Sequence, residues 1–151
     1  YPYQHLYSSR FAYQPLQPVF PVVASTGPYL DWLSESDSIL AVAGIGNPRP
    51  FVRHLKSFSA VVKVDIFPDH HFFNRKDIEH ITRRYNNLKG NNRIIVTTEK
   101  DAVRLANNPY FPYELKASTF YLPVEVDFAP TQTEALEQTI GKLLRQARTN
   151  R

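Results

Sequence analysis

The sequence contains no cysteine and no methionine. The lack of cysteine excludes disulfides and thiolate metal sites, and a chain without disulfides is compatible with the cytoplasm. The chain has no start residue and no signal-peptide pattern, so we expect it to be a piece of a longer protein. No apolar run approaches the roughly 20 residues that a membrane-spanning helix needs, so we do not expect this piece to span a bilayer.

Sequence motifs for binding nucleotide phosphates are also missing. The Gly-Lys-Ser/Thr string of a phosphate-binding loop does not occur. Gly44-Ile45-Gly46 is not a dinucleotide fingerprint, because the third glycine of that pattern is absent. We therefore expect no ATP, Mg²⁺ or other cofactor to bind this piece alone.

The overall composition is that of an ordinary globular domain. Of the 151 residues, 42% are hydrophobic and 21% are charged, so the chain can bury a core and is not a disordered polyelectrolyte. The formal net charge of +4 is compatible with a phosphorylated or anionic partner and equally with a basic domain that has none. We predict no nucleic-acid partner.

Two regions differ in amino-acid composition. Residues 1–38 are rich in proline and aromatic side chains, and proline removes backbone donors, so we expect an extended linker or β-ribbon there. From residue 39 to residue 151, apolar runs alternate with amphipathic stretches. Strands are expected at 39–44, 60–67, 93–98 and 118–128, and helices at 48–58, 75–89, 99–107 and 131–148. This alternation predicts an α/β fold, a Rossmann-like three-layer sandwich with a mostly parallel sheet.

Local signals support these elements. Asn47, Asn74 and Thr98 are the expected N-caps of the first three helices. The apolar stripe of the second helix is expected to be buried, as is the stripe of the last helix. Pro123 interrupts the strand expected at 118–128, which favours an edge or bulged strand.

Three polar clusters follow the first three strands of the expected sheet. They are Gly44–Pro48, Pro68–His71 and Thr97–Asp101. Loops after parallel strands open at the same carboxyl edge, where ligands bind in such sheets. The sequence therefore predicts that the three clusters meet in space.

Each cluster also has a structural interpretation. In this interpretation, Gly44 and Gly46 serve only a tight turn before the helix that Asn47 caps. Thr98 and Asp101 suit a helix start. Lys100 is less expected in a first helical turn, because a cation there opposes the helix dipole, and this makes it a candidate anion contact.

The pair Asp69–His70, followed by His71, has three interpretations. An aspartate beside a histidine can orient an imidazole for proton transfer. Adjacent histidines point in different directions, so we do not expect them to share a metal, and we predict no metal site. A polar loop without chemistry is the third interpretation.

The strings AVAGIGNPRPF, FPDHHFF and VTTEKDAVRL, in this order and spacing, resemble the C-terminal half of tetraacyldisaccharide 4'-kinases, the lipid A kinases of Gram-negative bacteria. The resemblance runs from about Tyr7 to about Leu144. It implies two α/β domains joined by a two-stranded ribbon, with the phosphate-binding loop, ATP and Mg²⁺ in an N-terminal domain absent here. It also implies Asp69 and His70 as catalytic residues. The residues that we expect to bind substrate or line the cleft are Gly44, Gly46, Asn47, His71, Thr98, Lys100 and Asp101.

The resemblance further implies transfer of the γ-phosphate of ATP to the 4'-hydroxyl of an acylated glucosamine disaccharide phosphate. The partners would be the N-terminal domain, this lipid and the membrane surface. The protein would then be peripheral at the cytoplasmic face of the bacterial inner membrane. Two alternatives stay open: a nucleotide-sugar or regulatory binding domain without chemistry, and a metal phosphoesterase of the Asp-His-His type.

Overall fold

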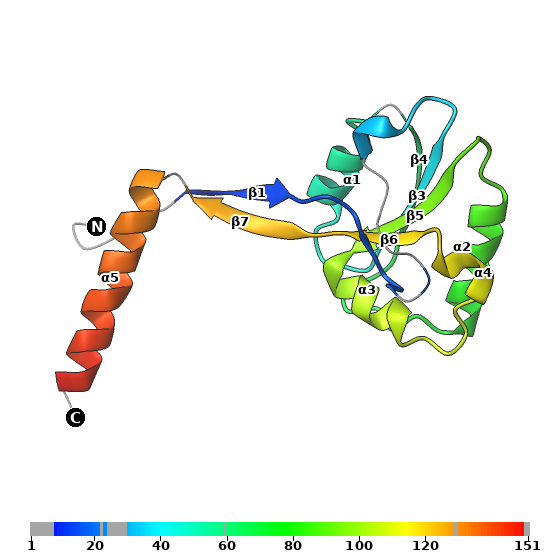
Figure 1. The fold of residues 1–151 in the computed structure, drawn as a ribbon. Coiled ribbons are helices and arrows are strands. Elements are labelled where there is room, and N and C mark those ends of the chain that lie inside the picture. The colour runs from blue at the N-terminus through cyan, green and yellow to red at the C-terminus, as the bar shows by residue number, and fades with distance from the viewer. Residues whose placement is uncertain (1–7, 22, 24–29, 59, 129, 150–151) are drawn as a thin grey trace. The chain divides into compact units, whose positions relative to one another are not determined.

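A computed structural model describes residues 8–21, 23, 30–58, 60–128 and 130–149; the side chains of residues 32, 130–133, 143 and 146–149 lie outside this description. The described chain divides into two compact units. One is an α/β unit at Gln14–Pro123, and the other contains the strands and helix at the two ends of the chain (Figure 1).

The α/β unit is built on a five-stranded sheet. Its strands stand in the order β2-β6-β5-β3-β4. β4, β3, β5 and β6 run parallel, and β2 pairs antiparallel with β6. The strands are β2 Gln17–Pro18, β3 Ser38–Ala43, β4 Val61–Ile66, β5 Arg93–Thr98 and β6 Thr119–Leu122. β3 is buried along its whole length, as a central parallel strand must be, so the expected mostly parallel α/β sheet is confirmed.

The helices of this unit begin close to where their caps predict. They are α1 Arg49–Leu55, α2 Arg75–Asn86, α3 Glu99–Ala106 and the short α4 Tyr113–Lys116, with a 3₁₀ turn at Leu30–Trp32. Asn74 and Thr98 are confirmed as N-caps of α2 and α3. α1 begins one residue later than expected, with Pro48 in the cap position, while the Asn47 side chain accepts a hydrogen bond from the Arg49 N–H.

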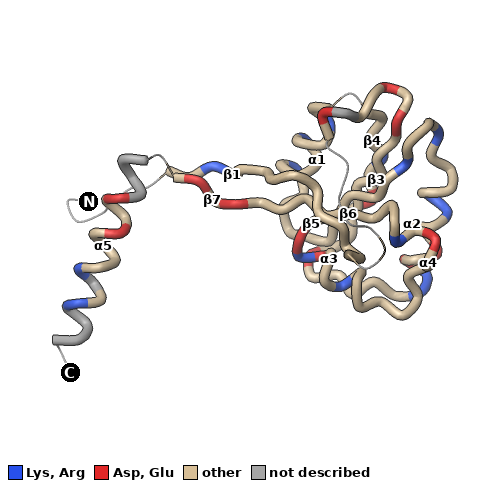
Figure 2. Tube along the Cα trace, in the orientation of Figure 1, with Lys and Arg blue, Asp and Glu red and all other residues tan. Residues whose placement is uncertain are grey.

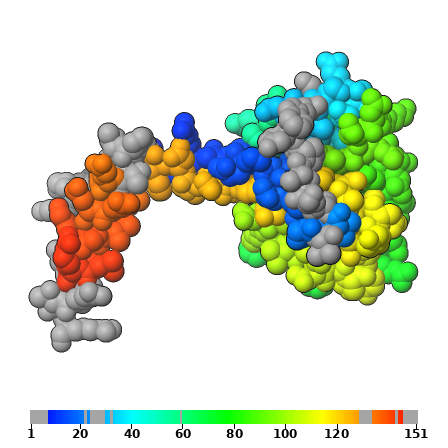
Figure 3. All heavy atoms as spheres, in the orientation of Figure 1, coloured from blue at the N-terminus to red at the C-terminus, as the bar shows by residue number. Residues whose placement is uncertain are grey.

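The main apolar core lies on one face of the sheet. Side chains of α2, α3 and α4 pack there against Leu40, Val42 and Ile95, and the expected stripe of α2 is buried. Right-handed crossovers place α1 on the opposite face, where Phe51 and Leu55 are buried; Figure 1 shows α1 and α2 on opposite sides of the strands. The space-filling view shows the unit as a closely packed body (Figure 3).

The second unit contains a two-stranded antiparallel ribbon. β1 Ser9–Tyr13 pairs with β7 Val124–Phe128, and Arg10 forms an ion pair of 2.7 Å with Asp127. The single strand expected at 118–128 is therefore wrong: β6 ends at Leu122 and β7 starts at Val124. Pro123 has no N–H to continue the ladder, so the chain leaves one sheet there and enters another.

The α/β unit includes part of the proline-rich region. Leu16 and Val19 are buried, and Phe20 belongs to the core of the α/β unit. Proline excludes a long strand in this stretch, yet the two residues of β2 still join the edge of the sheet. Among the described residues of the proline-rich region, only β1 forms ribbon.

The ribbon is followed by α5 Pro130–Thr149. Of its expected stripe, Leu136 is half-buried and Ile140 is 47% exposed, and the side chains of Leu143 and Ala147 lie outside the described ones. The spacing of Thr131 and Glu134 predicts a capping box at the start of this helix, but the side chain of Thr131 lies outside the described ones. No helix within the described ranges is both long and apolar enough to cross a membrane. Acidic and basic residues are interspersed along the α/β unit (Figure 2).

Candidate functional site at the carboxyl edge of the sheet

The strand order creates a crevice beside β3. β3 lies between β4 and β5, and the loop after β3 leads to α1 while the loop after β5 leads to α3. These two helices cover opposite faces, so the loops diverge and leave space between them at the carboxyl edge. This reversal of strand order is where ligands bind in open α/β sheets.

The first and third polar clusters are joined by a buried carboxylate. The backbone N–H of Gly44 donates to Oδ2 of Asp101 at 2.8 Å. The same oxygen accepts from the Thr98 hydroxyl at 2.7 Å, and Arg104 donates to the other oxygen at 2.8 Å. Asp101 is 0% exposed, so its role is to position the loop after β3 against the start of α3.

The glycines of the first cluster allow the second cluster to approach. A Cβ on Gly44 would lie 3.3 Å from both the Asp101 carboxylate and the Cβ of His71, and a Cβ on Gly46 would lie 3.2 Å from Oδ2 of Asp69. Such contacts are tighter than side chains usually make. The three clusters therefore meet in space, as the sequence predicted.

The exposed part of the site is formed by Asp69, His70 and Lys100. His70 Nδ1 lies 3.1 Å from Asp69 Oδ1, and Lys100 Nζ lies 3.1 Å from His70 Nε2 and 3.7 Å from Asp69 Oδ1. An ammonium group only donates, so Nε2 accepts from Lys100 and the ring proton lies on Nδ1, facing Asp69. This tautomer leaves a lone pair on Nε2, the atom that contacts Lys100.

The backbone of His70 is held in an uncommon conformation. Its φ is 58°, in the left-handed region, and it is the one non-glycine residue with positive φ within the described ranges. The Asp69 carboxylate accepts the His70 N–H at 2.9 Å, which supports this geometry. Residues in strained backbone conformations persist only where the surrounding structure stabilises them, and they cluster at functional sites.

The pKa of Asp69 responds to these neighbours. Partial desolvation acts to raise it, but the imidazole and backbone N–H of His70, together with the Lys100 ammonium, outweigh this effect. The pKa of Asp69 consequently lies below its ordinary value. Asp69 is thus a carboxylate at neutral pH, able to accept the Nδ1 proton of His70.

His71 has a different environment from His70. Its Nε2 lies 2.9 Å from the carboxylate of Asp77, and its ring stacks on Phe67 with a centroid distance of 4.9 Å. Asp77 also accepts the N–H of Asn74, closing the capping box of α2. The His71 ring therefore holds the loop against α2. Asn47 also has a structural contact, because its side chain accepts a hydrogen bond at the start of α1.

The described residues do not gather donors for a metal ion. No group of three histidine, aspartate or glutamate side chains lies close enough together within them. A two-metal phosphoesterase would require such a set, so no observation favours that alternative.

Comparison with known proteins bears on the kind of site this is. The sequence profile of the family described as Tetraacyldisaccharide-1-P 4'-kinase matches residues 9–145. The chain belongs to this kinase family. The match covers the α/β unit, the ribbon and most of α5, and the resemblance seen in the three sequence strings is confirmed.

Curated relatives of the family share much of this sequence. The Tetraacyldisaccharide 4'-kinase of Bacteroides thetaiotaomicron is 41% identical over 146 residues, covering 93% of this chain and 38% of the relative. That of Phocaeicola vulgatus is 36% identical, covering 96% of this chain and 39% of the relative. That of Porphyromonas gingivalis is 38% identical, covering 83% and 34%. The chain thus spans roughly two fifths of the length of these kinases. No solved structure matches the chain significantly.

Two features of the site were missed by sequence reasoning. Asp77 stands three residues after Asn74, a spacing that predicts a capping box. No sequence pattern indicates its contact with His71. Sequence reasoning also passed over Phe72, which follows the candidate His71 and is 84% exposed.

Proposed function

We propose that this chain is the C-terminal part of a kinase that transfers the γ-phosphate of ATP to the 4'-hydroxyl of tetraacyldisaccharide 1-phosphate. The observation that carries this proposal is the Asp69–His70–Lys100 cluster at the carboxyl edge of the sheet, in a chain of this kinase family. Phosphoryl transfer depends mainly on positioning and charge stabilisation, and an oriented base assists the attacking hydroxyl.

In this proposal, His70 is the proton acceptor and Asp69 orients it. The acceptor hydroxyl of the lipid takes the place of Lys100 at Nε2, and the lone pair there receives the hydroxyl proton. Asp69 then faces an imidazolium, whose charge it stabilises. The displaced ammonium of Lys100, which is half-exposed, is free to contact an anionic group of the reactants.

The residues of this chain do not fit ATP or Mg²⁺. It has no Gly-Lys-Ser/Thr string, and its described residues hold no metal-donor cluster. We assign both to an N-terminal domain, within the part of the relatives' length that this chain does not match. That domain and the lipid are the proposed partners, and the proposed location is peripheral, at the cytoplasmic face of the bacterial inner membrane.

A phosphoryl-transfer assay tests the proposal. The full-length protein should transfer phosphate from ATP to the 4'-position of tetraacyldisaccharide 1-phosphate, as detected by mass spectrometry of the product. Calorimetry of the 151-residue chain with Mg-ATP should show no binding near micromolar concentrations. A saturable isotherm at that level, or turnover by this chain alone, would contradict the assignment of ATP to another domain.

A further inference from the structure

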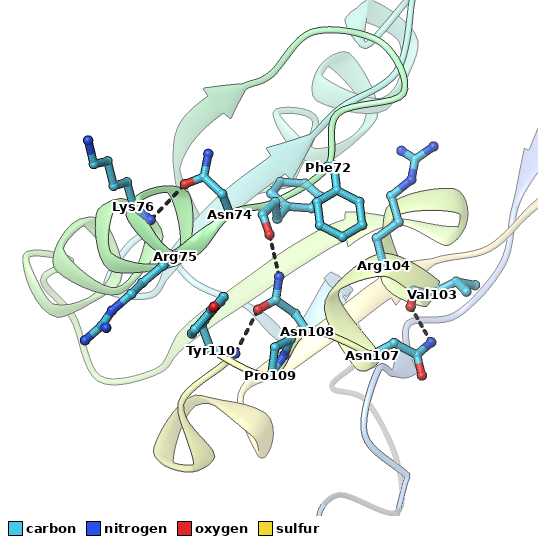
Figure 4. A pocket seen from close by; sticks show the side chains of 11 residues that line it. Phe72, Asn74, Arg75, Lys76, Val103, Arg104, Asn107, Asn108, Pro109 and Tyr110 are labelled. Atoms are coloured by element: carbon cyan, nitrogen blue, oxygen red, sulfur yellow. Dashed lines mark hydrogen bonds between the residues drawn. The ribbon is translucent and has the colours of Figure 1, made fainter.

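A groove of about 880 Å³ lies beside the candidate catalytic cluster. The start of α2 forms one wall, and α3 and the loop that follows it form the other (Figure 4). The groove shares its supports with the cluster: Phe72 belongs to the same loop as His70, and Val103 stands one helical turn from Lys100 on α3. Its volume is within the usual range of small-molecule sites.

The groove is lined by large apolar side chains that the fold leaves exposed. Phe72 is 84% exposed, Val103 64% and Tyr110 53%. The neighbouring Phe73 is 2% exposed and fills the core, so the exposure of Phe72 is specific to its position. Clustered exposed apolar side chains mark binding surfaces, and these three provide an apolar wall for a ligand.

Cations border the same groove, and its lining contains no acidic residue. Arg75 and Lys76 occupy the first turn of α2, where positive charge opposes the helix dipole and weakens the helix. Arg75 forms an exposed ion pair with Glu79 at 3.1 Å, and Lys76 forms no ion pair with any carboxylate among the described residues. An anion bound here would compensate for this unfavourable placement.

The walls of the groove are tied together by hydrogen bonds. The Asn108 side chain donates to the Phe73 carbonyl at 2.6 Å and accepts the Tyr110 N–H at 2.9 Å (Figure 4). The Arg75 guanidinium lies 6.0 Å from the centre of the Tyr110 ring. The loop after α3 is thereby fixed to the start of α2, so the groove is formed before any ligand arrives.

We propose that this groove binds one acyl chain of a phosphorylated lipid. The chain lies against Phe72, Val103 and Tyr110, and the phosphate lies against Lys76 and Arg75. An apolar wall with a cationic rim matches an anionic amphiphile and matches neither a free phosphate nor a neutral lipid. The inference rests on the proposed function, since a tetraacylated disaccharide phosphate has both groups and the groove adjoins His70.

Binding of decyl phosphate below its micellar concentration tests the groove directly. Titration of the 151-residue chain, followed by amide nuclear magnetic resonance, should give saturable shifts at Phe72, Lys76 and Val103. Inorganic phosphate and decanol, each carrying half of the recognition, should bind at least about tenfold more weakly. Phe72→Ser should weaken decyl phosphate binding about tenfold or more, and Lys76→Ala should weaken it severalfold.

Matched variants control for general effects. Phe11→Ser removes an exposed phenylalanine on the ribbon, and Lys63→Ala removes an exposed lysine on β4. Neither residue lines the groove, so neither substitution should change the affinity for decyl phosphate. The inference is overturned if decyl phosphate gives no saturable shifts or if the controls weaken binding as much. It is also overturned if the chain binds anionic phosphatidylglycerol vesicles but not decyl phosphate, because the surface would then recognise a bilayer.

Kinetics of the full-length protein separate this inference from the proposed function. Phe72→Ser should raise KM for the acylated acceptor about tenfold with kcat little changed. An unchanged KM would overturn the proposal that the groove binds an acyl chain. A lowered melting temperature would overturn it too, because it would show that the rest of the protein covers Phe72. Neither result would contradict phosphoryl transfer. If decyl phosphate binds and the full-length protein transfers no phosphate, the proposed function fails and the groove stands.

Discussion

Lys100 Nζ lies 3.1 Å from Nε2 of His70 and 3.7 Å from Oδ1 of Asp69, so the ammonium contacts both members of the Asp69–His70 pair. The imidazole thus contacts a donor at Nε2 and an acceptor at Nδ1. Lys100 can only donate and the Asp69 carboxylate can only accept, so the two neighbours together select the tautomer with its proton on Nδ1. This is the form that leaves Nε2 able to accept a proton from a hydroxyl.

Nuclear magnetic resonance of the imidazole tests this tautomer. In the 151-residue chain above the titration range of the ring, the nitrogen-15 shifts of His70 should report a protonated Nδ1 and an unprotonated Nε2. Lys100→Met should increase the population protonated at Nε2, and Lys100→Arg should preserve the original state. A wild-type ring protonated mainly at Nε2 would show that Lys100 does not bond to it in solution.

The N-cap of α3 makes a measurable contribution to stability. The Thr98 hydroxyl accepts from the Asp101 N–H and donates to the buried Asp101 carboxylate. Thr98→Ala should therefore lower the free energy of unfolding by about 0.5–2 kcal/mol, the usual range for a lost N-cap. Urea melts measure the change, with Thr82→Ala in the interior of α2 as the control that should be nearly neutral. An unchanged midpoint for Thr98→Ala would exclude the capping role.

Most of the α/β unit could be predicted from the sequence because its signals are local. Continuous apolar runs mark β3 and β5, and Asn74 and Thr98 mark helix starts. The pairing of β1 with β7 joins residues from opposite ends of the chain, and no periodicity reports such a contact. Similarly, Pro123 indicated an interrupted strand, but it did not show that the chain leaves one sheet there and enters another.

The candidate site was partly predictable for the same reason. The rule that loops after parallel strands share one edge brought Gly44, Asp69 and Lys100 together without any side-chain information. Side-chain directions were not available from spacing. Consequently the contact of Lys100 with His70, the turn of His71 toward Asp77 and the burial of Asp101 had to come from the structure.

Asp37 should make the stability of the fold depend on acid pH. The Ser34 N–H and hydroxyl and the Asn92 N–H and amide bond to its carboxylate. The Ser34 N–H is the main cause that holds the pKa of Asp37 below its ordinary 3.8, against an opposing effect of desolvation. A lowered folded-state pKa gives stability that is complete above the unfolded pKa and is lost as pH falls through the folded one.

Urea melts between neutral pH and the acid range below 3.8 should therefore show a steeper acid loss for the wild type than for Asp37→Asn. The variant should be less stable at neutral pH, and the two curves should converge in acid. Parallel curves over this range would show that the hydrogen bonds to Asp37 do not favour its charged form.

The two glycines after β3 should respond differently to alanine. Gly44 is buried against Asp101, His71 and the Pro68 carbonyl, so Gly44→Ala should reduce stability by about 1–3 kcal/mol, as overpacking does. Gly46 is exposed and lies against Asp69 alone. Gly46→Ala should change stability by less than about 0.5 kcal/mol while lowering kcat of the full-length kinase, because it displaces the carboxylate that orients His70. Urea melts and steady-state kinetics compare them, and the reverse ranking would contradict the described packing.

The most direct test of the account compares His70→Ala with His71→Ala in the full-length protein by steady-state kinetics. Losing a general base typically lowers a rate by about 10²–10⁴, so His70→Ala should lower kcat by that order while KM for ATP stays near its normal value. His71→Ala should retain most of kcat and instead lower the melting temperature, since its ring packs on Phe67 and bonds to Asp77. A crippled His71→Ala beside an active His70→Ala, or two fully active variants, would contradict the assignment of His70 as the proton acceptor.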